Sequence, residues 1–198
     1  MNILMISDVY FPRVNGVSTS IATVRSALHK SGHRTLLLAP QYPDCSQPEA
    51  DIIRIPARYL CFDPEDRVMR LRPLLQHLHT LQPARFDIVH IHTPFQAHRA
   101  GIHFARQHRL PVVETYHTFF EEYFHHYLPL LPRSWLRLAA REVSRRLENH
   151  LDGLIVPSLS IEQALRRYGI RIPIRIIPTG LNLTEFTPGD KTRFCHRH

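Results

Sequence analysis

The sequence predicts an α/β protein built on a doubly wound, mostly parallel, Rossmann-like sheet. Short apolar runs recur along the chain, as expected for parallel strands that are covered on both faces. Segments with helical periodicity separate these runs, and repeated alternation of strand and helix implies right-handed crossovers. The chain has 198 residues and is 43% hydrophobic, which is enough for one domain with its own core.

Seven runs are expected to form strands. In chain order they are NILMIS (2–7), RTLLLAP (34–40), DIIRIP (51–56), FDIVHIHT (86–93), VVETYH (112–117), GLIVPS (153–158) and IRIIPTG (174–180). Helices are expected between them, at about 16–32, 65–82, 95–109, 133–151 and 159–169. We assign residues 1–180 to the sheet domain and 181–198 to a connector and tail. Because IPTGLNLTEFTPGD (177–190) reads as a turn-rich connector, we expect a second half to be missing.

The helix expected at 133–151 has the clearest pattern. Pro132 can start it, and an apolar stripe follows, formed by Leu136, Ala140, Val143 and Leu147. Arg137, Arg141 and Arg145 fall on nearly the opposite side. A solvated arginine face is the simpler interpretation, and contact with anionic lipid headgroups is the functional one.

The overall charge favours an anionic partner. The formal charge is +8 and the sequence pI is about 9.9, which suits nucleic acid, an acidic membrane surface or a phosphorylated substrate. Nucleic acid is disfavoured, because the basic residues are spread over several predicted helices and no reader fold is recognised. Cys45, Cys61 and Cys195 are widely spaced and odd in number, which argues against a disulfide framework and for a reducing cytoplasm.

Two features bear on membranes and secretion. The longest apolar stretches are well below the roughly 20 residues that a spanning helix needs. The N-terminal MNILMIS has no basic leader, and Asp8 interrupts its apolar run, so it does not resemble a secretion signal. We therefore expect a cytoplasmic protein, with peripheral contact at the inner membrane face as an alternative.

The first stretch that carries chemistry is SDVYFPRVNGVSTS (7–20), which lies between the first strand and the first helix. Ligands of an open parallel sheet bind at the carboxyl ends of its strands, and this loop is expected there. We expect Asn15 and Gly16 to form a tight turn, with Gly16 allowing close approach of a ligand. The free N–H groups of the following helix favour a phosphate. The stretch lacks GxGxxG and GK[ST], so an ordinary turn with a helix start remains an alternative.

The second stretch is VHIHTPF (89–95). His90 and His92 are two positions apart on a strand and therefore point to one face, which would suit two metal ligands. Asp8 and His117 could complete the set of a metal-dependent hydrolase. We favour the interpretation in which His90 packs inside the sheet and His92 lines the loop, because no HExxH-like spacing completes the motif.

The third stretch is ETYHTFFEEYFHHY (114–127). Its strand brings His117 to the same carboxyl edge as Gly16 and His92. A histidine there can orient or polarise a hydroxyl, because its ordinary pKa is near neutrality. The aromatic residues that follow could cover an apolar acceptor, enter a membrane surface or belong to the core.

Taken in order, five stretches resemble the N-terminal half of family 4 glycosyltransferases of the GT-B fold. They are MNILMISDVYFPRVNGVSTSI, FDIVHIHTPF, VVETYHTFFEEYFHHY, DGLIVPS and IIPTGLNLTEF. The aromatic stretch is most like the branch of diacylglycerol glucosyltransferases and mannosyltransferases. The resemblance covers about residues 1–188 and implies two Rossmann-like lobes that face each other across a cleft. It also implies a retaining sugar transfer that uses a nucleotide-sugar donor, with no metal and no other cofactor.

The resemblance assigns roles to particular positions. Gly16 would lie against the diphosphate and sugar of the donor, with Asn15 and Val17 beside it. His117 would act as the catalytic residue that contacts the transferred sugar near the reacting centre. The acceptor pocket would be formed by His92, Thr93 and Tyr116. Glu185 and Phe186 would belong to the connector that leads into the second lobe.

The family's C-terminal lobe, with its paired glutamates that hold the donor, has no counterpart in this sequence. We therefore expect the chain to be a truncated gene product, a fragment or half of a split enzyme, and not to catalyse transfer alone. A separate C-terminal half is a candidate partner. A metal-dependent hydrolase that uses His90, His92 and His117 is one alternative. A non-enzymatic module that binds a lipid or glycan is another.

Overall fold

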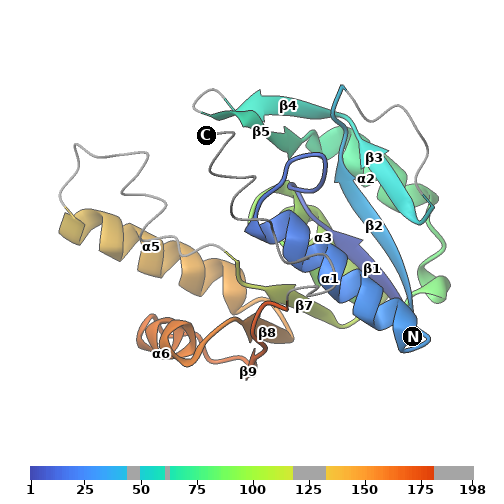
Figure 1. The fold of residues 1–198 in the computed structure, drawn as a ribbon. Coiled ribbons are helices and arrows are strands. Elements are labelled where there is room, and N and C mark those ends of the chain that lie inside the picture. The colour runs from blue at the N-terminus through green and yellow to red at the C-terminus, as the bar shows by residue number, and fades with distance from the viewer. Residues whose placement is uncertain (44–49, 61–62, 118–132, 181–198) are drawn as a thin grey trace, which may run out of the picture.

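The computed structural model describes residues 1–43, 50–60, 63–117 and 133–180 (Figure 1). Several sequence predictions lie outside the described residues. They concern the three cysteines, Pro132, the aromatic stretch after His117, and the connector with Glu185 and Phe186.

In the part of the chain that the structure describes, the main sheet is parallel throughout and has seven strands in the order β3-β2-β1-β6-β7-β8-β9. The strands are β1 (Asn2–Ile6), β2 (Arg34–Pro40), β3 (Ile52–Ile55), β6 (Ile88–Ile91), β7 (Val112–Thr115), β8 (Gly153–Val156) and β9 (Ile174–Ile176). The chain proceeds in one direction from β1 to β3 and in the other from β6 to β9. This doubly wound arrangement confirms the predicted fold class (Figure 1).

Helices cover both faces of the sheet, in the way that the two winding directions require. Among the described residues they are α1 (Gly16–Lys30), α2 (Leu71–Thr80), the 3₁₀ turn η1 (Pro83–Arg85), α3 (Gln96–His108), α5 (Arg133–Glu148) and α6 (Leu159–Arg167). Successive β1 residues alternate between the faces. Ile3 and Met5 pack with Ile21 of α1, whereas Leu4 and Ile6 belong to the larger core that α2, α3 and α6 cover.

The structure corrects the predicted helix at 65–82. An antiparallel hairpin of β4 (Ala57–Leu60) and β5 (Asp63–Met69) takes the first part of this range, and α2 begins only at Leu71. The physical reason is Pro73. Proline is tolerated in the first turn of a helix and breaks its interior, so a helix that began at residue 65 would carry Pro73 at a damaging position.

The apolar stripe expected for α5 is present where the side chains are described. Val143 and Leu147 pack against the larger core, and Arg141 and Arg145 are exposed. The side chains of Leu136, Arg137 and Ala140 lie outside the described residues. None of the helices in the described ranges is long and apolar enough to cross a membrane.

Candidate functional site at the carboxyl edge of the sheet

Most of the predicted site residues lie at one edge of the sheet. Because all seven strands are parallel, their carboxyl ends meet at the same edge. Asp8 follows β1, His92 and Thr93 follow β6, and His117 follows β7. The loop from β1 leads at the same edge into the N-terminus of α1, where Gly16 lies.

A buried carboxylate holds this edge together. Asp8 accepts hydrogen bonds from the backbone N–H groups of Met69, at 3.1 Å, and Ala97, at 2.8 Å. The Thr93 hydroxyl donates to the Asp8 carboxylate at 3.1 Å, and its oxygen accepts from the Asp8 N–H at 2.7 Å. Burial raises the pKa of Asp8 to about 6, although these hydrogen bonds act in the opposite direction. Asp8 therefore joins β1, β5, β6 and α3.

Three imidazoles form a row beside this network, which we call the histidine row: His90, His92 and His117. The rings of His90 and His92 have centroids 4.0 Å apart, which confirms that the two side chains share a face of the sheet. His92 Nδ1 lies 3.3 Å from His117 Nε2. His90 Nε2 lies 2.7 Å from the Thr115 hydroxyl, so His90 packs inside the sheet as expected.

Burial makes the histidine row neutral. It lowers the pKa of His90 to about 3 and of His117 to about 4, and it lowers the pKa of His92 well below its ordinary value. The Nε2 atom of His92 is buried and has no hydrogen-bond partner among the described residues. Neutral imidazoles donate from one nitrogen and accept at the other. His117, the half-buried member of the row, is therefore suited to a hydrogen bond with a substrate hydroxyl.

The N-terminus of α1 differs from the turn that we predicted. Asn15 is extended and caps the helix, because its side-chain oxygen accepts from the Ser18 N–H at 2.9 Å. Gly16 is the first helical residue, and a Cβ placed on it would meet nothing within 4 Å. Val17 packs partly against the core beneath α1. The tight-turn prediction is therefore wrong, and the fold itself does not require glycine at this position.

An apolar cavity of about 340 Å³ lies beneath α1, over β6, β7 and β8. Tyr116 and His117 line it together with His90, whereas the predicted acceptor residues His92 and Thr93 do not. Much of the remaining wall comes from apolar residues of the sheet and α1, and from residues 177–180. Sequence reasoning missed this cavity because its walls come from segments far apart in the chain.

A second buried network lies on the opposite face of β7. His98 Nδ1 is 2.6 Å from a carboxylate oxygen of Glu114, and both side chains are almost fully buried. Glu148 of α5 is completely buried, and neither carboxylate oxygen has a hydrogen-bond partner among the described residues. Burial, and then the charge of Glu114, raises the pKa of Glu148 well above its ordinary value. The Tyr116 hydroxyl, 3.4 Å from Ser144, extends this packing of β7 against α5.

The geometry does not favour the metal-dependent hydrolase. Both carboxylate oxygens of Asp8 accept hydrogen bonds from Met69, Ala97 and Thr93, so Asp8 does not join His90 and His117. Within the described ranges, no three His, Cys, Asp or Glu side chains are arranged to hold a metal ion.

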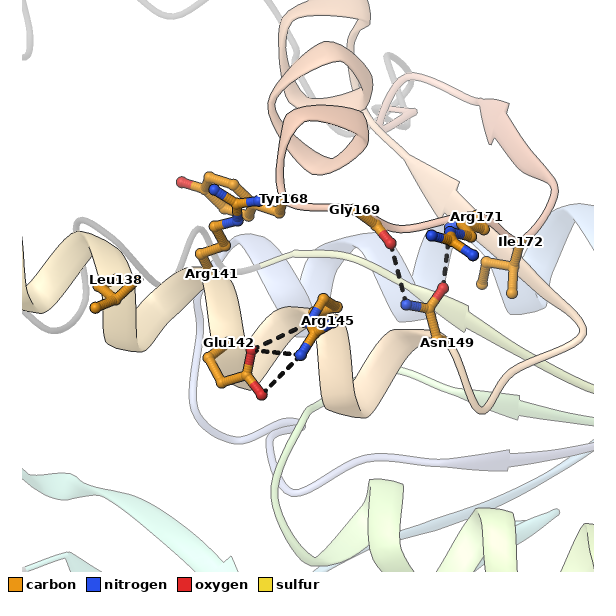
Figure 2. Close-up of a pocket in the computed structure, with 9 residues that line it drawn as sticks. All are labelled: Leu138, Arg141, Glu142, Arg145, Asn149, Tyr168, Gly169, Arg171 and Ile172. Carbon is orange, nitrogen blue, oxygen red and sulfur yellow. Dashed lines mark hydrogen bonds and ion pairs between the residues drawn. The ribbon is translucent and has the colours of Figure 1, made fainter.

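Another cleft, of about 870 Å³, lies between α5 and the turn from α6 to β9 (Figure 2). Arg141, Arg145 and Arg171 line it. Glu142 binds Arg145 in an ion pair of 2.8 Å, and Asn149 accepts a hydrogen bond from the Arg171 N–H at 2.9 Å. Two of the three arginines predicted to share a face of α5 therefore border a common cleft.

Comparison with known proteins identifies the family. The profile described as Glycosyltransferase Family 4 matches residues 14–185, which is more than half of the chain. This chain belongs to glycosyltransferase family 4. The resemblance found in the sequence is thereby confirmed.

Curated relatives of this family 4 chain include an α-monoglucosyldiacylglycerol synthase from Streptococcus pneumoniae. It is 34% identical over 189 residues, which are 94% of this chain and 42% of the relative. A GDP-mannose-dependent α-mannosyltransferase from Mycobacterium tuberculosis is 26% identical, over 100% of this chain and 52% of the relative. The chain thus spans about half the length of the curated relatives it matches.

Two solved structures of similar fold are also about twice as long. Sucrose-phosphate synthase from Thermosynechococcus elongatus superposes with a TM-score of 0.70 at 19% identity, over 100% of this chain and 52% of the other. Anabaena HepE, solved in complex with UDP-glucose, superposes with a TM-score of 0.59 at 16% identity, over 100% and 49%. At these identities the likeness concerns the fold alone, which is one half of a GT-B fold.

Proposed function

We propose that this chain is the acceptor-side half of a retaining glycosyltransferase, which moves a sugar from a nucleotide-sugar donor to a lipid or glycan acceptor. The observation that carries the proposal is the contact between His92 and His117, at the sheet edge where α1 also begins. Membership of family 4 supports it, as do the names of relatives from the glucosyl and mannosyl branches.

The N-terminus of α1 is the proposed donor side. The first N–H groups of a helix have no partner within the helix. The Asn15 side chain accepts a hydrogen bond from the Ser18 N–H. The N–H groups of Gly16 and Val17 would then be left to bind an anion. Together with the positive end of the helix dipole, they would stabilise the diphosphate as charge develops on it. A diphosphate that stays open to water on its other side gains little from them, so transfer requires a facing lobe that closes over it.

His117 is the proposed residue at the reacting centre. Its pKa of about 4 keeps it neutral at physiological pH, and His92 fixes one of its nitrogens through a 3.3 Å contact. The remaining nitrogen would form a hydrogen bond with a hydroxyl of the transferred sugar. The Thr93 hydroxyl forms two hydrogen bonds with Asp8. Its proposed role is therefore to hold the acceptor edge in place.

A lipid acceptor is favoured over a glycan. The cavity of about 340 Å³ begins beside Tyr116 and His117 and is lined largely by apolar side chains. Such a surface suits the apolar part of a lipid, whereas a glycan would leave it in contact with water.

A peripheral position at the inner membrane face is consistent with the outer side of α5. Arg141 and Arg145 are exposed there, and Trp135 and Leu138 are 70% and 68% exposed. Basic side chains attract anionic lipids, and a neighbouring aromatic residue anchors at the interface. Arg137 belongs to the same proposed face by sequence position.

The test is a transfer assay with two forms of the protein. One form is the chain alone, and the other is the chain joined to the C-terminal half of the Streptococcus pneumoniae relative. UDP-glucose and GDP-mannose serve as donors, and diacylglycerol vesicles supply the acceptor. We expect transfer from the joined form only.

Ordinary turnover by the chain alone would contradict the need for a facing lobe. Stoichiometric zinc or manganese in the purified chain would favour the hydrolase, and lipid binding without donor binding in the joined form would favour a binding module.

A further inference from the structure

The loop between β1 and α1 leads to the proposed donor side, and we call its residues 7–15 the donor loop. Both ends of this loop are held, because Asp8 forms hydrogen bonds with Thr93 and Asn15 caps α1. Between these ends, positions 9–14 form no backbone–backbone hydrogen bond within the described residues. The middle of the donor loop therefore depends on side chains from other parts of the fold.

One such side chain is Arg54, near the carboxyl end of β3. Its Nη1 atom donates to the carbonyl of Phe11 at 2.7 Å and to the carbonyl of Pro40, the last residue of β2, at 3.2 Å. Hydrogen bonds from a charged donor are stronger than those between neutral groups. Arg54 thereby ties the donor loop, the dark blue segment before α1 in Figure 1, to the ends of two strands.

Arg54 lies on the face of the sheet that α1 covers. Ile52, two positions earlier in β3, packs in the core beneath α1, and side chains two positions apart in a strand share a face. Arg54 is in register with Ala39, one residue before the end of β3. Its guanidinium is therefore at the carboxyl edge, on the side from which α1 begins.

Tyr10 is the buried anchor of the donor loop. The guanidinium carbon of Arg54 lies 5.5 Å from the centroid of the Tyr10 ring, within range of a cation–π contact. The Phe11 ring meets the Tyr10 ring edge-on, with centroids 5.2 Å apart. Arg54 thus contacts the donor loop twice, through the backbone at Phe11 and through the side chain at Tyr10.

Arg25 of α1 holds the other end of the Tyr10 side chain. Its Nη1 atom donates to the Tyr10 hydroxyl at 3.3 Å, its Nε to the Thr35 hydroxyl at 3.1 Å and its Nη2 to the Asp51 carbonyl at 3.3 Å. Arg25 is only 8% exposed, and a buried cation must keep its hydrogen bonds. It therefore gives Tyr10 a fixed partner within the fold.

We infer that Arg54 is a positioning residue of the proposed sugar transfer. It holds the donor loop, through Phe11 and Tyr10, in the shape in which the N–H groups of Gly16 and Val17 meet the diphosphate of the donor. This role in donor binding rests on the proposed function, whereas the fixing of the loop does not. A loop that is not held in advance must be ordered when the donor binds, and this ordering lowers the affinity.

Hydrogen exchange of the chain tests the fixing of the donor loop in the absence of any donor. Arg54→Met removes the guanidinium and keeps a long side chain. The matched control is Arg175→Met, which removes an exposed arginine from β9, the strand at the other edge of the sheet. We expect amide exchange at residues 9–15 to be at least about tenfold faster in Arg54→Met and within about twofold of the wild type in the control. Thermal melts establish that both variants are folded.

Kinetics of the joined enzyme test the consequence for the donor. Arg54→Met should raise KM for the nucleotide sugar about tenfold and leave kcat, and KM for the acceptor, within about twofold. The reason is that the loop is ordered once, when the donor binds. Arg54→Lys should restore the donor KM to within about threefold of the wild type, because an ammonium group can still donate to both carbonyls. Tyr10→Phe loses only the hydrogen bond from Arg25 and should raise the donor KM less than Arg54→Met does.

Several outcomes would overturn the inference. Unchanged exchange in Arg54→Met, or an equal increase in Arg175→Met, would show that Arg54 does not hold the donor loop. A loss confined to kcat, or equal increases in the donor and acceptor KM, would refute the role in donor binding. Should Arg54→Met melt far below the wild type, Tyr10→Phe repeats the exchange measurement, and unchanged exchange in that variant would equally overturn the inference.

The inference and the proposed function fail separately. If Gly16→Val loses donor affinity while Arg54→Met keeps it, the proposed donor side stands and Arg54 has no positioning role. Absence of transfer in every form would refute the proposed function, while hydrogen exchange would still decide whether Arg54 holds the donor loop.

Discussion

The Nε2 atom of His117 lies 3.3 Å from Nδ1 of His92, and this contact joins the ends of β7 and β6. Both imidazoles are neutral at physiological pH because burial lowers their pKa. One nitrogen of the contact must then donate and the other accept, so the tautomer of one ring fixes that of the other. His92 therefore determines whether the outer nitrogen of His117 presents a proton or a lone pair to a substrate.

Acid should destabilise the fold through the histidine row. The folded pKa values of about 3 for His90 and about 4 for His117 lie below the ordinary value of 6.5. The unfolded chain thus binds more protons between these values, and stability falls as the pH drops from about 6.5 towards 4. We expect a loss on the order of 1–2 kcal/mol per buried histidine between about pH 7 and pH 5. Urea unfolding at several pH values measures this loss. In a His90→Gln variant the free energy of unfolding should depend less steeply on pH. The same pH dependence in the variant and the wild type would contradict the burial argument.

Gly16→Val should spare the fold and impair donor binding. A Cβ at Gly16 meets nothing within 4 Å, whereas a Cβ at Gly101 would lie 2.8 Å from the side chain of Ile91. We therefore expect Gly16→Val to cost less than about 1 kcal/mol and Gly101→Ala to cost more, through overpacking. In the joined enzyme, the Gly16 variant should lose nucleotide-sugar affinity, measured by calorimetry. Full affinity would place the donor elsewhere.

Alkaline pH should expose the cost of burying Glu148. Its raised pKa means that the folded state holds a proton which the unfolded state has released. Its stabilising contribution is therefore complete below about pH 4.5 and is lost as the pH rises through the folded pKa. Glu148→Gln should remove this dependence. The free energy of unfolding of the wild type should therefore fall relative to that of the variant as the pH rises. Glu162→Gln is the control, and parallel curves for Glu148→Gln and wild type would show that Glu148 is not buried as described.

Asp8→Ala should destabilise the fold because it leaves three donors without an acceptor. The affected groups are the N–H groups of Met69 and Ala97 and the hydroxyl of Thr93. We expect a loss of about 2–4 kcal/mol in denaturant unfolding. Asp87→Ala, which removes one exposed hydrogen bond to the Asn2 N–H, should cost well under about 1 kcal/mol. Similar losses in both variants would argue against the central position of Asp8.

The sheet could be predicted from the sequence because its strands are covered on both faces and therefore read as continuous apolar runs. The β4–β5 hairpin could not, since DPEDRVM contains good helix formers and the deciding residue, Pro73, lies beyond it. His92 and His117 were found because each lies within two residues of the end of a strand at the same edge.

The remaining contacts of the site depend on distant pairings that no local pattern records. Asp8 was visible only as a polar residue after a strand, and its partners at Met69 and Ala97 lie 61 and 89 positions away. Glu148 reads as an ordinary helical glutamate, because its burial follows from how α5 packs on β7.

The rate of sugar transfer by the joined enzyme tests the central claim most directly. We compare His117→Ala with His103→Ala, which removes an exposed imidazole of α3. If His117 contacts the transferred sugar at the carboxyl edge, its variant should lose at least about a hundredfold in kcat while melting close to the wild type. The His103 variant should remain within about twofold. Equal kcat values for both variants and the wild type would contradict the account.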